Sequence, residues 1–318
     1  MKKIGILTSG GDAPGMNAHI RAVVRYGMRM GLEVVGIENG FEGLIEATFR
    51  KMNARSTANI IAQGGTILYT SRSKAFYNVG GRAAGADRIR NANIDALIVC
   101  GGDGTFHGAH ALWEEHKIPI IGTPGTIDND LYGTDWTIGY DTAINTAAEA
   151  IDKIRDTAYS HGRVFIIEVM GRNAGFIAMD VGIAAGAEYI AVPETKSNID
   201  ILYKKILEQG KNKRTIVIVG EGDELGGALA LSRIMKDKFD VDSHVTILGH
   251  IQRGGSPTVR DRVLATRLGV AAVDALLEGR ADIMIGQINK QLSYIPLPDT
   301  WSKKKQLINY QLALSEAI

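Results

Sequence analysis

The sequence predicts an α/β protein of the doubly wound type. Short aliphatic runs alternate with longer amphipathic stretches along the chain, which is typical of this class. Most of the short runs are continuously apolar, as in strands of a parallel sheet that is covered on both faces. The 38 glycines fall largely at strand ends, where a ligand can approach the backbone. The predicted strands exceed what one mononucleotide-binding unit needs, so we expect two sheets.

The individual elements follow from the same patterns. The predicted strands are Lys3–Leu7, Glu33–Ile37, Ala96–Cys100, Ile118–Gly122, Arg163–Val169, Tyr189–Val192, Thr215–Val219 and His244–Leu248. Amphipathic periodicity predicts helices over Met16–Met30, Phe106–His116 and Thr142–Thr157.

Composition excludes several classes of function. The 318 residues include 36 Lys and Arg against 35 Asp and Glu, and a net charge of +1 argues against a general nucleic-acid surface. The single cysteine, Cys100, leaves no intramolecular disulfide and fits a reducing compartment. We see no signal peptide and no apolar run of membrane-spanning length. We therefore expect a cytoplasmic protein with neither nucleic-acid nor membrane partners.

Two glycine-rich loops indicate phosphate binding. Thr8–Gly15 follows the first predicted strand, and Gly101–Thr105 follows the strand that ends at Cys100; each loop precedes a helix. Glycines let backbone N–H groups turn toward an anion, and a helix N-terminus adds partial positive charge. Asp103 among phosphates makes sense if Mg²⁺ bridges them, although Asp is also a common helix N-cap. A tight turn without a ligand explains the first loop alone equally well.

A third loop, Pro124–Asp130, carries paired carboxylates. Asp128 and Asp130 are two residues apart, and the hydroxyl of Thr126 precedes them. One carboxylate can accept a proton from an attacking alcohol while the other orients it or helps to hold a metal. On spacing alone, a surface turn rich in Asp and Asn explains this segment as well.

Taken together, these three loops resemble the bacterial-type ATP-dependent 6-phosphofructokinases. Further matches cover nearly the full length, and they are Thr137–Ala143, Ser160–Arg163, Met170–Arg172 and Leu248–Gly255. The resemblance implies two doubly wound three-layer α/β domains with the active site in the cleft between them. The ATP-binding domain would span residues 1–138 plus about 254–300. The sugar-phosphate domain would span residues 139–253 plus the tail, about 301–318.

The resemblance also implies roles for individual residues. Asp128 would be the general base toward the 1-hydroxyl of fructose 6-phosphate, with Thr126, Arg72 and Arg172 as the other catalytic residues. Mg-ATP would be bound by Gly11, Arg72, Ser73, Gly102, Asp103, Gly104 and Thr105, with Asp103 on the Mg²⁺ ion. The sugar phosphate would be bound by Thr126, Ile127, Asp128, Arg163, Met170, Gly171, Arg172, Glu221, His244, His250, Ile251, Gln252 and Arg253. Some phosphate ligands would come from a neighbouring subunit, which implies a homotetramer.

Two regions depart from the family pattern. The family usually has arginine at the position of His244, and histidine is only partly protonated at pH 7. We therefore expect weaker or more pH-dependent binding of the sugar phosphate. An effector site for a nucleoside diphosphate or phosphoenolpyruvate is matched only in part, because Ala54 replaces an arginine and the segment 211–214 aligns ambiguously. Its implied residues are Arg21, Arg25, Arg155, Gly186, Glu188, Lys211 and Lys213, although Arg21 and Arg25 also fit an ordinary solvated face.

Other readings compete with an ATP-dependent kinase. Pyrophosphate-dependent relatives usually have Asp at the position of Gly104 and Lys at that of Gly125, so both glycines favour ATP. NAD and diacylglycerol kinases share the Gly101–Thr105 type of loop but lack the other motifs. Neither loop has the G-x-G-x-x-G spacing of a dinucleotide-binding dehydrogenase. A non-catalytic sugar-phosphate sensor would be marked by loss of Asp128, Asp103 or Arg72, and all three are present.

Overall fold

The computed structural model describes residues 1–161, 163–208 and 215–307. The chain divides into two compact units. The first contains residues 1–127, 131–142 and 253–305, and the second contains residues 128–130, 143–252 and 306–318. Both units combine helices with a largely parallel sheet, so the predicted α/β class is confirmed.

The first unit is built on a seven-stranded sheet of order β11-β10-β5-β4-β1-β2-β3. Its strands are β1 (Lys3–Thr8), β2 (Glu33–Ile37), β3 (Phe49–Lys51), β4 (Ala96–Gly101), β5 (Ile120–Pro124), β10 (Ile283–Ile288) and β11 (Gln291–Pro296). The strands from β10 to β2 in this order pair in parallel, while the edge strands β3 and β11 are antiparallel. Strands β1, β4 and β5 are almost wholly buried, which matches their continuously apolar sequences.

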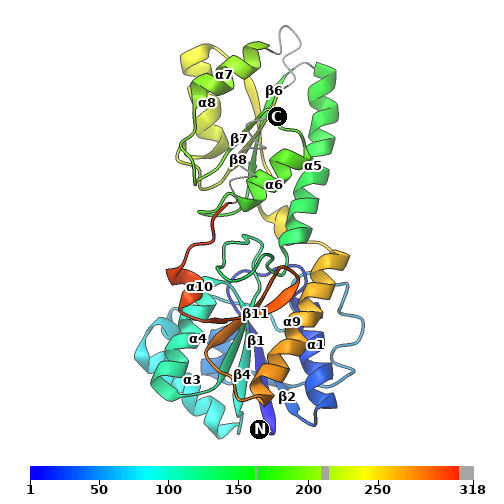
Figure 1. The fold of residues 1–318 in the computed structure, drawn as a ribbon, viewed down its shortest axis with the longest axis vertical. Helices are drawn as coiled ribbons and strands as arrows, with labels where there is room; N and C mark the ends of the chain where they lie inside the picture. Colours follow the sequence, from blue (N-terminus) through cyan, green and yellow to red (C-terminus); the bar gives the residue numbers. More distant parts are fainter. Residues whose placement is uncertain (162, 209–214, 308–318) are drawn as a thin grey trace. The chain divides into compact units, whose positions relative to one another are not determined.

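Helices cover both faces of this sheet (Figure 1). Helices α1 (Met16–Arg29) and α9 (Val259–Leu277) pack together on one face. The other face is covered by α2 (Gly40–Glu46), α3 (Val79–Asn91) and α4 (Asp103–His116), whose apolar side chains form one core with the sheet. The short elements η1 (Ala75–Tyr77) and α10 (Asp299–Ser302) complete the unit, and α5 (Tyr140–His161) begins in it.

The second unit has a four-stranded parallel sheet of order β7-β8-β6-β9. Its strands are β6 (Val164–Val169), β7 (Tyr189–Ala191), β8 (Thr215–Gly220) and β9 (Ser243–Ile247). Helix α6 (Phe176–Ala184) packs on β7 and β8, while α7 (Ile199–Glu208) and α8 (Gly227–Phe239) share a separate apolar core with the sheet. The turn η3 (Gly249–Arg253) follows β9.

The predicted strands are all present, with ends that differ by at most two residues. Three strands that we did not predict are β3, β10 and β11. The predicted helix Phe106–His116 begins three residues earlier, at Asp103, so Gly102 and not Asp103 occupies the N-cap position. No helix of the described part of the chain is long and apolar enough to cross a membrane.

Candidate functional site

The two glycine-rich loops lie next to each other in the first unit, because β1 and β4 are neighbours in the sheet. The strands pair in parallel with Thr8 opposite Cys100, so both chains leave the sheet at the same edge. Strand β2 lies on the other side of β1, so successive connections diverge between β1 and β4. This is a topological switch point, where open α/β sheets bind ligands beyond the carboxyl ends of their strands.

Hydrogen bonds fix these loops to one another. The Ser9 N–H donates to the Cys100 carbonyl over 3.0 Å, and the buried Thr105 hydroxyl donates to the Ser9 carbonyl over 3.1 Å. Gly101 allows this approach, since a Cβ there would lie 2.5 Å from the Ser9 oxygen. Thr105 therefore joins the loops, and its side chain faces the protein.

The N-terminus of α4 provides an open anion site. The Asp103 carboxylate is exposed and accepts the Gly104 N–H over 2.6 Å. A Cβ on Gly104 would meet no atom within 4 Å, so packing does not require glycine there. The helix dipole favours phosphate at this end, and a carboxylate oxygen beside it is a hard ligand of the kind that Mg²⁺ prefers. The residues present thus fit Mg-nucleotide binding.

The third loop packs directly against the second. The Gly125 N–H donates to the Gly101 carbonyl over 3.0 Å, and a Cβ on Gly125 would lie 2.6 Å from the Cys100 Sγ. A lysine at position 125 would therefore displace the buried Cys100. The Thr137 hydroxyl donates to the Thr126 carbonyl over 2.6 Å, which positions the half-buried Thr126.

The remaining predicted nucleotide residues take different positions in the first unit. Arg72 is exposed and has no hydrogen bond or ion pair within the described parts of the chain. Ser73 is buried, and its hydroxyl accepts the Phe76 N–H at the start of η1. Gly11 lies against the Arg253 guanidinium so closely that a Cβ would collide with it, and Arg253 lies 3.9 Å from the Asp12 carboxylate. Arg253, predicted as a sugar-phosphate residue, thus contacts the first glycine-rich loop.

In the second unit, Asp128 and Arg172 lie together. Asp128 is 2% exposed, and its Oδ2 lies 3.4 Å from the Arg172 Nε. Arg172 follows β6, and its backbone N–H donates to the Glu221 carboxylate, which follows β8, over 2.7 Å. Strands β6 and β8 pair in parallel, so both loops leave the same sheet edge. Met170 is buried in the first of these loops, and Gly171 has a φ of +143°, which glycine adopts without strain.

The predicted phosphate ligands Arg163 and His244 form a pair. An Arg163 guanidinium N–H donates to the His244 Nε2 over 3.0 Å, and the imidazole stacks on Phe165 with ring centroids 5.2 Å apart. Within Gly249–Arg253, His250 and Ile251 are exposed, while Gln252 is buried and donates to the Gly249 carbonyl over 3.2 Å. Gln252 therefore stabilises the turn that presents His250.

The predicted effector residues fall into two groups. Arg21 and Arg25 lie on α1 in the first unit, where Arg25 donates to the Thr57 hydroxyl and the Ala54 carbonyl, both over 3.4 Å. In the second unit, Arg155 donates to the Ala185 and Gly186 carbonyls, and the Glu188 carboxylate accepts the Ile216 N–H. Lys211 and Lys213 lie outside the described residues.

Asp261, which no predicted motif includes, fixes the helix ends near the third loop. Its carboxylate is buried and accepts hydrogen bonds from the Gly139 N–H, the Thr142 N–H and the Thr142 hydroxyl. Burial raises the pKa of Asp261 from 3.8 to about 6, against the opposing effect of these bonds. A sequence signal existed, because Thr258 and Asp261 have the spacing of a helix-capping pair.

Comparisons with known proteins agree with this geometry. The phosphofructokinase family matches residues 3–276. An ATP-dependent 6-phosphofructokinase 1 of Thermus thermophilus is 53% identical and covers 100% of this chain and 99% of its own. The ATP-dependent 6-phosphofructokinase of Cytophaga hutchinsonii is 49% identical, and the match covers 100% of this chain and 98% of that protein.

Solved structures also match. Phosphofructokinase from Saccharomyces cerevisiae superposes with a TM-score of 0.86 and 35% identity, covering 99% of this chain, which spans 47% of the yeast chain. A pyrophosphate-dependent phosphofructokinase from Marinobacter aquaeolei has a TM-score of 0.86, and the match covers 98% of this chain and 86% of that one. At 23% sequence identity, this likeness shows the fold alone. The chain belongs to the phosphofructokinase family.

Proposed function

We propose that this chain is an ATP-dependent 6-phosphofructokinase, which transfers the γ-phosphoryl group of ATP to the 1-hydroxyl of fructose 6-phosphate. The observation that carries this conclusion is the pair of glycine-rich loops joined at the β1–β4 switch point. One of them opens α4 with free space at Gly104. The products are fructose 1,6-bisphosphate and ADP, as in a step of glycolysis.

On the nucleotide side, Gly11, Arg72, Ser73 and the loop from Gly102 to Thr105 would bind ATP. Phosphoryl transfer in this family needs a divalent metal, and we assign Mg²⁺ to Asp103 because of its exposed carboxylate at a helix N-terminus. Mg²⁺ would neutralise charge on the phosphates. The exposed guanidinium of Arg72 is available to stabilise charge on the transferring group.

On the acceptor side, Asp128 would take the proton of the sugar 1-hydroxyl. The Arg172 guanidinium, 3.4 Å away, stabilises the ionised carboxylate and orients it. A carboxylate is a weak base toward an alcohol, so the proton leaves late, as the new phosphorus–oxygen bond forms. Thr126 precedes this base and would contact the substrate.

The other predicted residues of the second unit carry complementary charges for a sugar phosphate. Arg163, Arg172, His244 and His250 supply donors for the 6-phosphate dianion, and the exposed Glu221 can accept sugar hydroxyls. We propose that the first unit is the ATP-binding domain and the second the sugar-phosphate domain. We further propose a cytoplasmic homotetramer, with effector residues Arg21 and Arg25 on α1 and Arg155, Gly186 and Glu188 in the second unit.

Turnover with different phosphoryl donors tests the proposal. With Mg²⁺ and fructose 6-phosphate, we expect ADP formation with ATP and none above background with pyrophosphate. Turnover with pyrophosphate alone would overturn the donor assignment, and no turnover by folded protein would support a sensor of the same fold. Asp128→Asn keeps the side-chain shape and should lower kcat about 10²–10⁴-fold, the usual contribution of a general base.

A further inference from the structure

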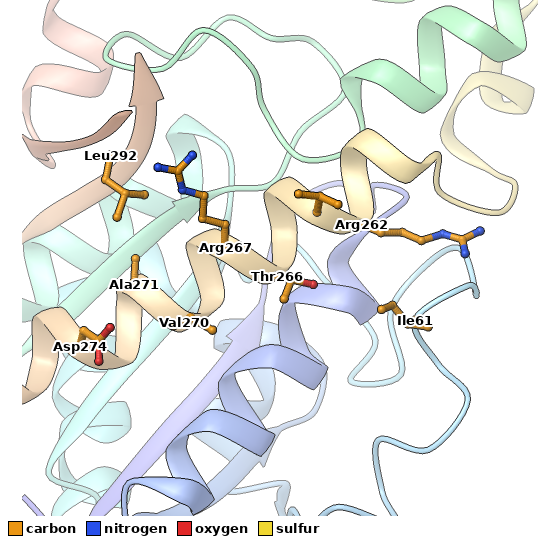
Figure 2. A pocket seen from close by; sticks show the side chains of 9 residues that line it. Ile61, Arg262, Thr266, Arg267, Val270, Ala271, Asp274 and Leu292 are labelled. Atoms are coloured by element: carbon orange, nitrogen blue, oxygen red, sulfur yellow. The ribbon is translucent and has the colours of Figure 1, made fainter. Parts of the chain in front are cut away.

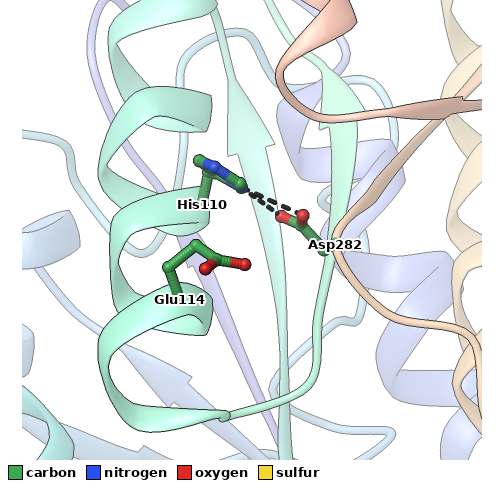
Figure 3. Close-up of side chains that lie close together, drawn as sticks. All are labelled: His110, Glu114 and Asp282. Atoms are coloured by element: carbon green, nitrogen blue, oxygen red, sulfur yellow. Dashed lines mark hydrogen bonds and ion pairs between the residues drawn. The ribbon is translucent and has the colours of Figure 1, made fainter.

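A cluster of three side chains on the far part of α4 has no role in phosphoryl transfer. His110 and Glu114 are four residues apart on one face of the helix, and Asp282 lies in the turn before β10 (Figure 3). One potential ligand atom from each lies within 4.8 Å of the others, and all three residues belong to the first unit. Among the described residues, this is the one such group of three.

We infer that His110, Glu114 and Asp282 bind a divalent transition-metal ion of the Zn²⁺ type and thereby link α4 to the β10 turn. One imidazole and two carboxylates favour Zn²⁺ over Mg²⁺ or Ca²⁺, which prefer oxygen ligands alone. A neutral histidine with two carboxylates carries two negative charges, which a divalent ion neutralises. Three protein ligands leave a position for water.

The distances suit such an ion with small movements. Metal bonds of ~2.1 Å in a tetrahedral site place ligand atoms ~3.4 Å apart. The His110 Nδ1 already lies 2.9 Å from both Asp282 oxygens, so these groups need to separate by only about half an ångström. Glu114 has the longest way to move. Its side chain is 56% exposed, and among the described residues its one ion pair is with Lys117 at 3.7 Å, which holds it weakly.

Aromatic side chains pack around His110 and limit its movement. The Trp301 ring lies 5.8 Å from the His110 ring and stacks at 3.8 Å on that of His107, which restricts this face of α4. Fixed rings and partners around a metal ligand reduce the cost of ordering it. The usual competitor for Zn²⁺, a thiol, is absent from the surface: Cys100 is the only cysteine and is buried, which raises its pKa to about 12.

The site is separate from the proposed nucleotide metal. The nearer helical ligand, His110, is seven residues after Asp103, which corresponds to ~10 Å along the helix. Excess Mg²⁺ in the assay would therefore occupy the nucleotide site and leave the cluster to Zn²⁺. This separation lets the inference and the proposed function fail independently.

The test is Zn²⁺ titration calorimetry on the full chain in excess Mg²⁺, with Co²⁺ absorption as a second probe of tetrahedral coordination. We expect one Zn²⁺ per chain for wild type. His110→Gln and Asp282→Asn should each weaken binding at least tenfold. Asp282→Asn keeps an oxygen that accepts the His110 N–H, so the hydrogen bond survives while the metal ligand is lost. Kinase activity in Mg²⁺ should stay at the wild-type value.

His116→Gln is the matched control, since it removes a histidine from the same helix but outside the cluster. Zn²⁺ should raise the Tm of wild type and of this control, and leave that of His110→Gln unchanged. Equal Zn²⁺ affinity in wild type, His110→Gln and Asp282→Asn would overturn the inference, as would an absence of binding to wild type at micromolar Zn²⁺. Glu114→Gln, at an exposed position, repeats the test if either variant fails to fold.

Discussion

Gly104 and Gly125 are both glycines, but the space around their Cα atoms differs. Gly125 has no room for a side chain, because Cys100 fills the space, whereas Gly104 faces open space at the start of α4. Packing within the protein therefore requires glycine at position 125 but not at position 104. We propose that a bound nucleotide uses the free space at Gly104, and this difference from Gly125 leads to a direct test.

Gly104→Ala should leave stability within ~1 kcal/mol of wild type, because its methyl group meets no protein atom and alanine favours a helix. The KM for ATP should rise about tenfold, equivalent to ~1.4 kcal/mol, because the methyl group crowds the phosphates. Steady-state kinetics and urea unfolding measure the two effects. Gly80→Ala, in a similarly open helical position on α3, is the control. It should leave the KM for ATP and the KM for fructose 6-phosphate unchanged. An unchanged KM in Gly104→Ala would contradict nucleotide binding here.

His244 gives a second prediction at this scale. In the structure its Nε2 accepts a hydrogen bond from Arg163, an arrangement that requires the neutral ring. His244→Arg would remove this acceptor and place a second permanent cation beside Arg163. We expect the KM for fructose 6-phosphate in His244→Arg to be about threefold lower than in wild type, because a guanidinium can donate to a phosphate in bidentate geometry. Equal KM values in the two proteins would show that position 244 does not bind the sugar phosphate.

At the scale of elements, Asp261 joins the start of α5 to α9 through a buried carboxylate. Its folded-state pKa of about 6 lies above the unfolded value of 3.8, so the native state holds the proton more tightly. The contribution of this group to the free energy of unfolding is complete below about pH 4. It is lost as the pH rises through 6, and the change amounts to ~3 kcal/mol at most.

Asp261→Asn removes this titration but places an amide against backbone donors, so it should destabilise the protein. The loss relative to wild type should be largest at or below about pH 4 and shrink toward pH 7. Urea unfolding of both proteins at the two pH values measures it. A difference that stays constant would mean that Asp261 does not titrate between these values.

The elements differ in how well the sequence predicts them. β1, β4 and β8 are continuously apolar, because both faces are buried, and their patterns are unambiguous. β11 alternates polar and apolar residues at an edge, and β3 has three residues, so neither carries that signal. The loops were predictable because glycines gather where strands end, although a glycine-rich turn alone does not show whether a ligand binds there. The Arg163–His244 pair and the Asp261 bonds join residues far apart in the chain, which no local pattern reveals.

At the scale of the molecule, an apolar surface on the first unit bears on the proposed homotetramer. A cavity of about 470 Å³ lies along α9 and is lined by Ile61, Arg262, Val263, Thr266, Arg267, Val270, Ala271, Asp274 and Leu292 (Figure 2). Val259 and Val263 on the same helix are 76% and 62% exposed. Apolar surface of this kind is typical of subunit interfaces.

Val263→Asp places a charge in the apolar surface along α9 and should therefore shift the tetramer toward dimers and monomers. Light scattering coupled to gel filtration measures the mass. Leu229→Asp is the control, because Leu229 is similarly exposed on α8 of the second unit but lies outside this surface. A tetramer that persists in Val263→Asp would exclude the α9 surface as an interface.

The return of the chain to the first unit at residue 253 also sets the order in which the molecule can be completed during synthesis. Strand β10 pairs with β5, and α9 packs on α1, yet both partners leave the ribosome more than a hundred residues earlier. The second unit draws most of its residues from the single stretch 143–252. We therefore expect its core to form first, while the nascent first unit still has β5 unpaired at one edge of its sheet and only α1 on one face. During that interval the partial first unit is the part of the chain most in need of a chaperone.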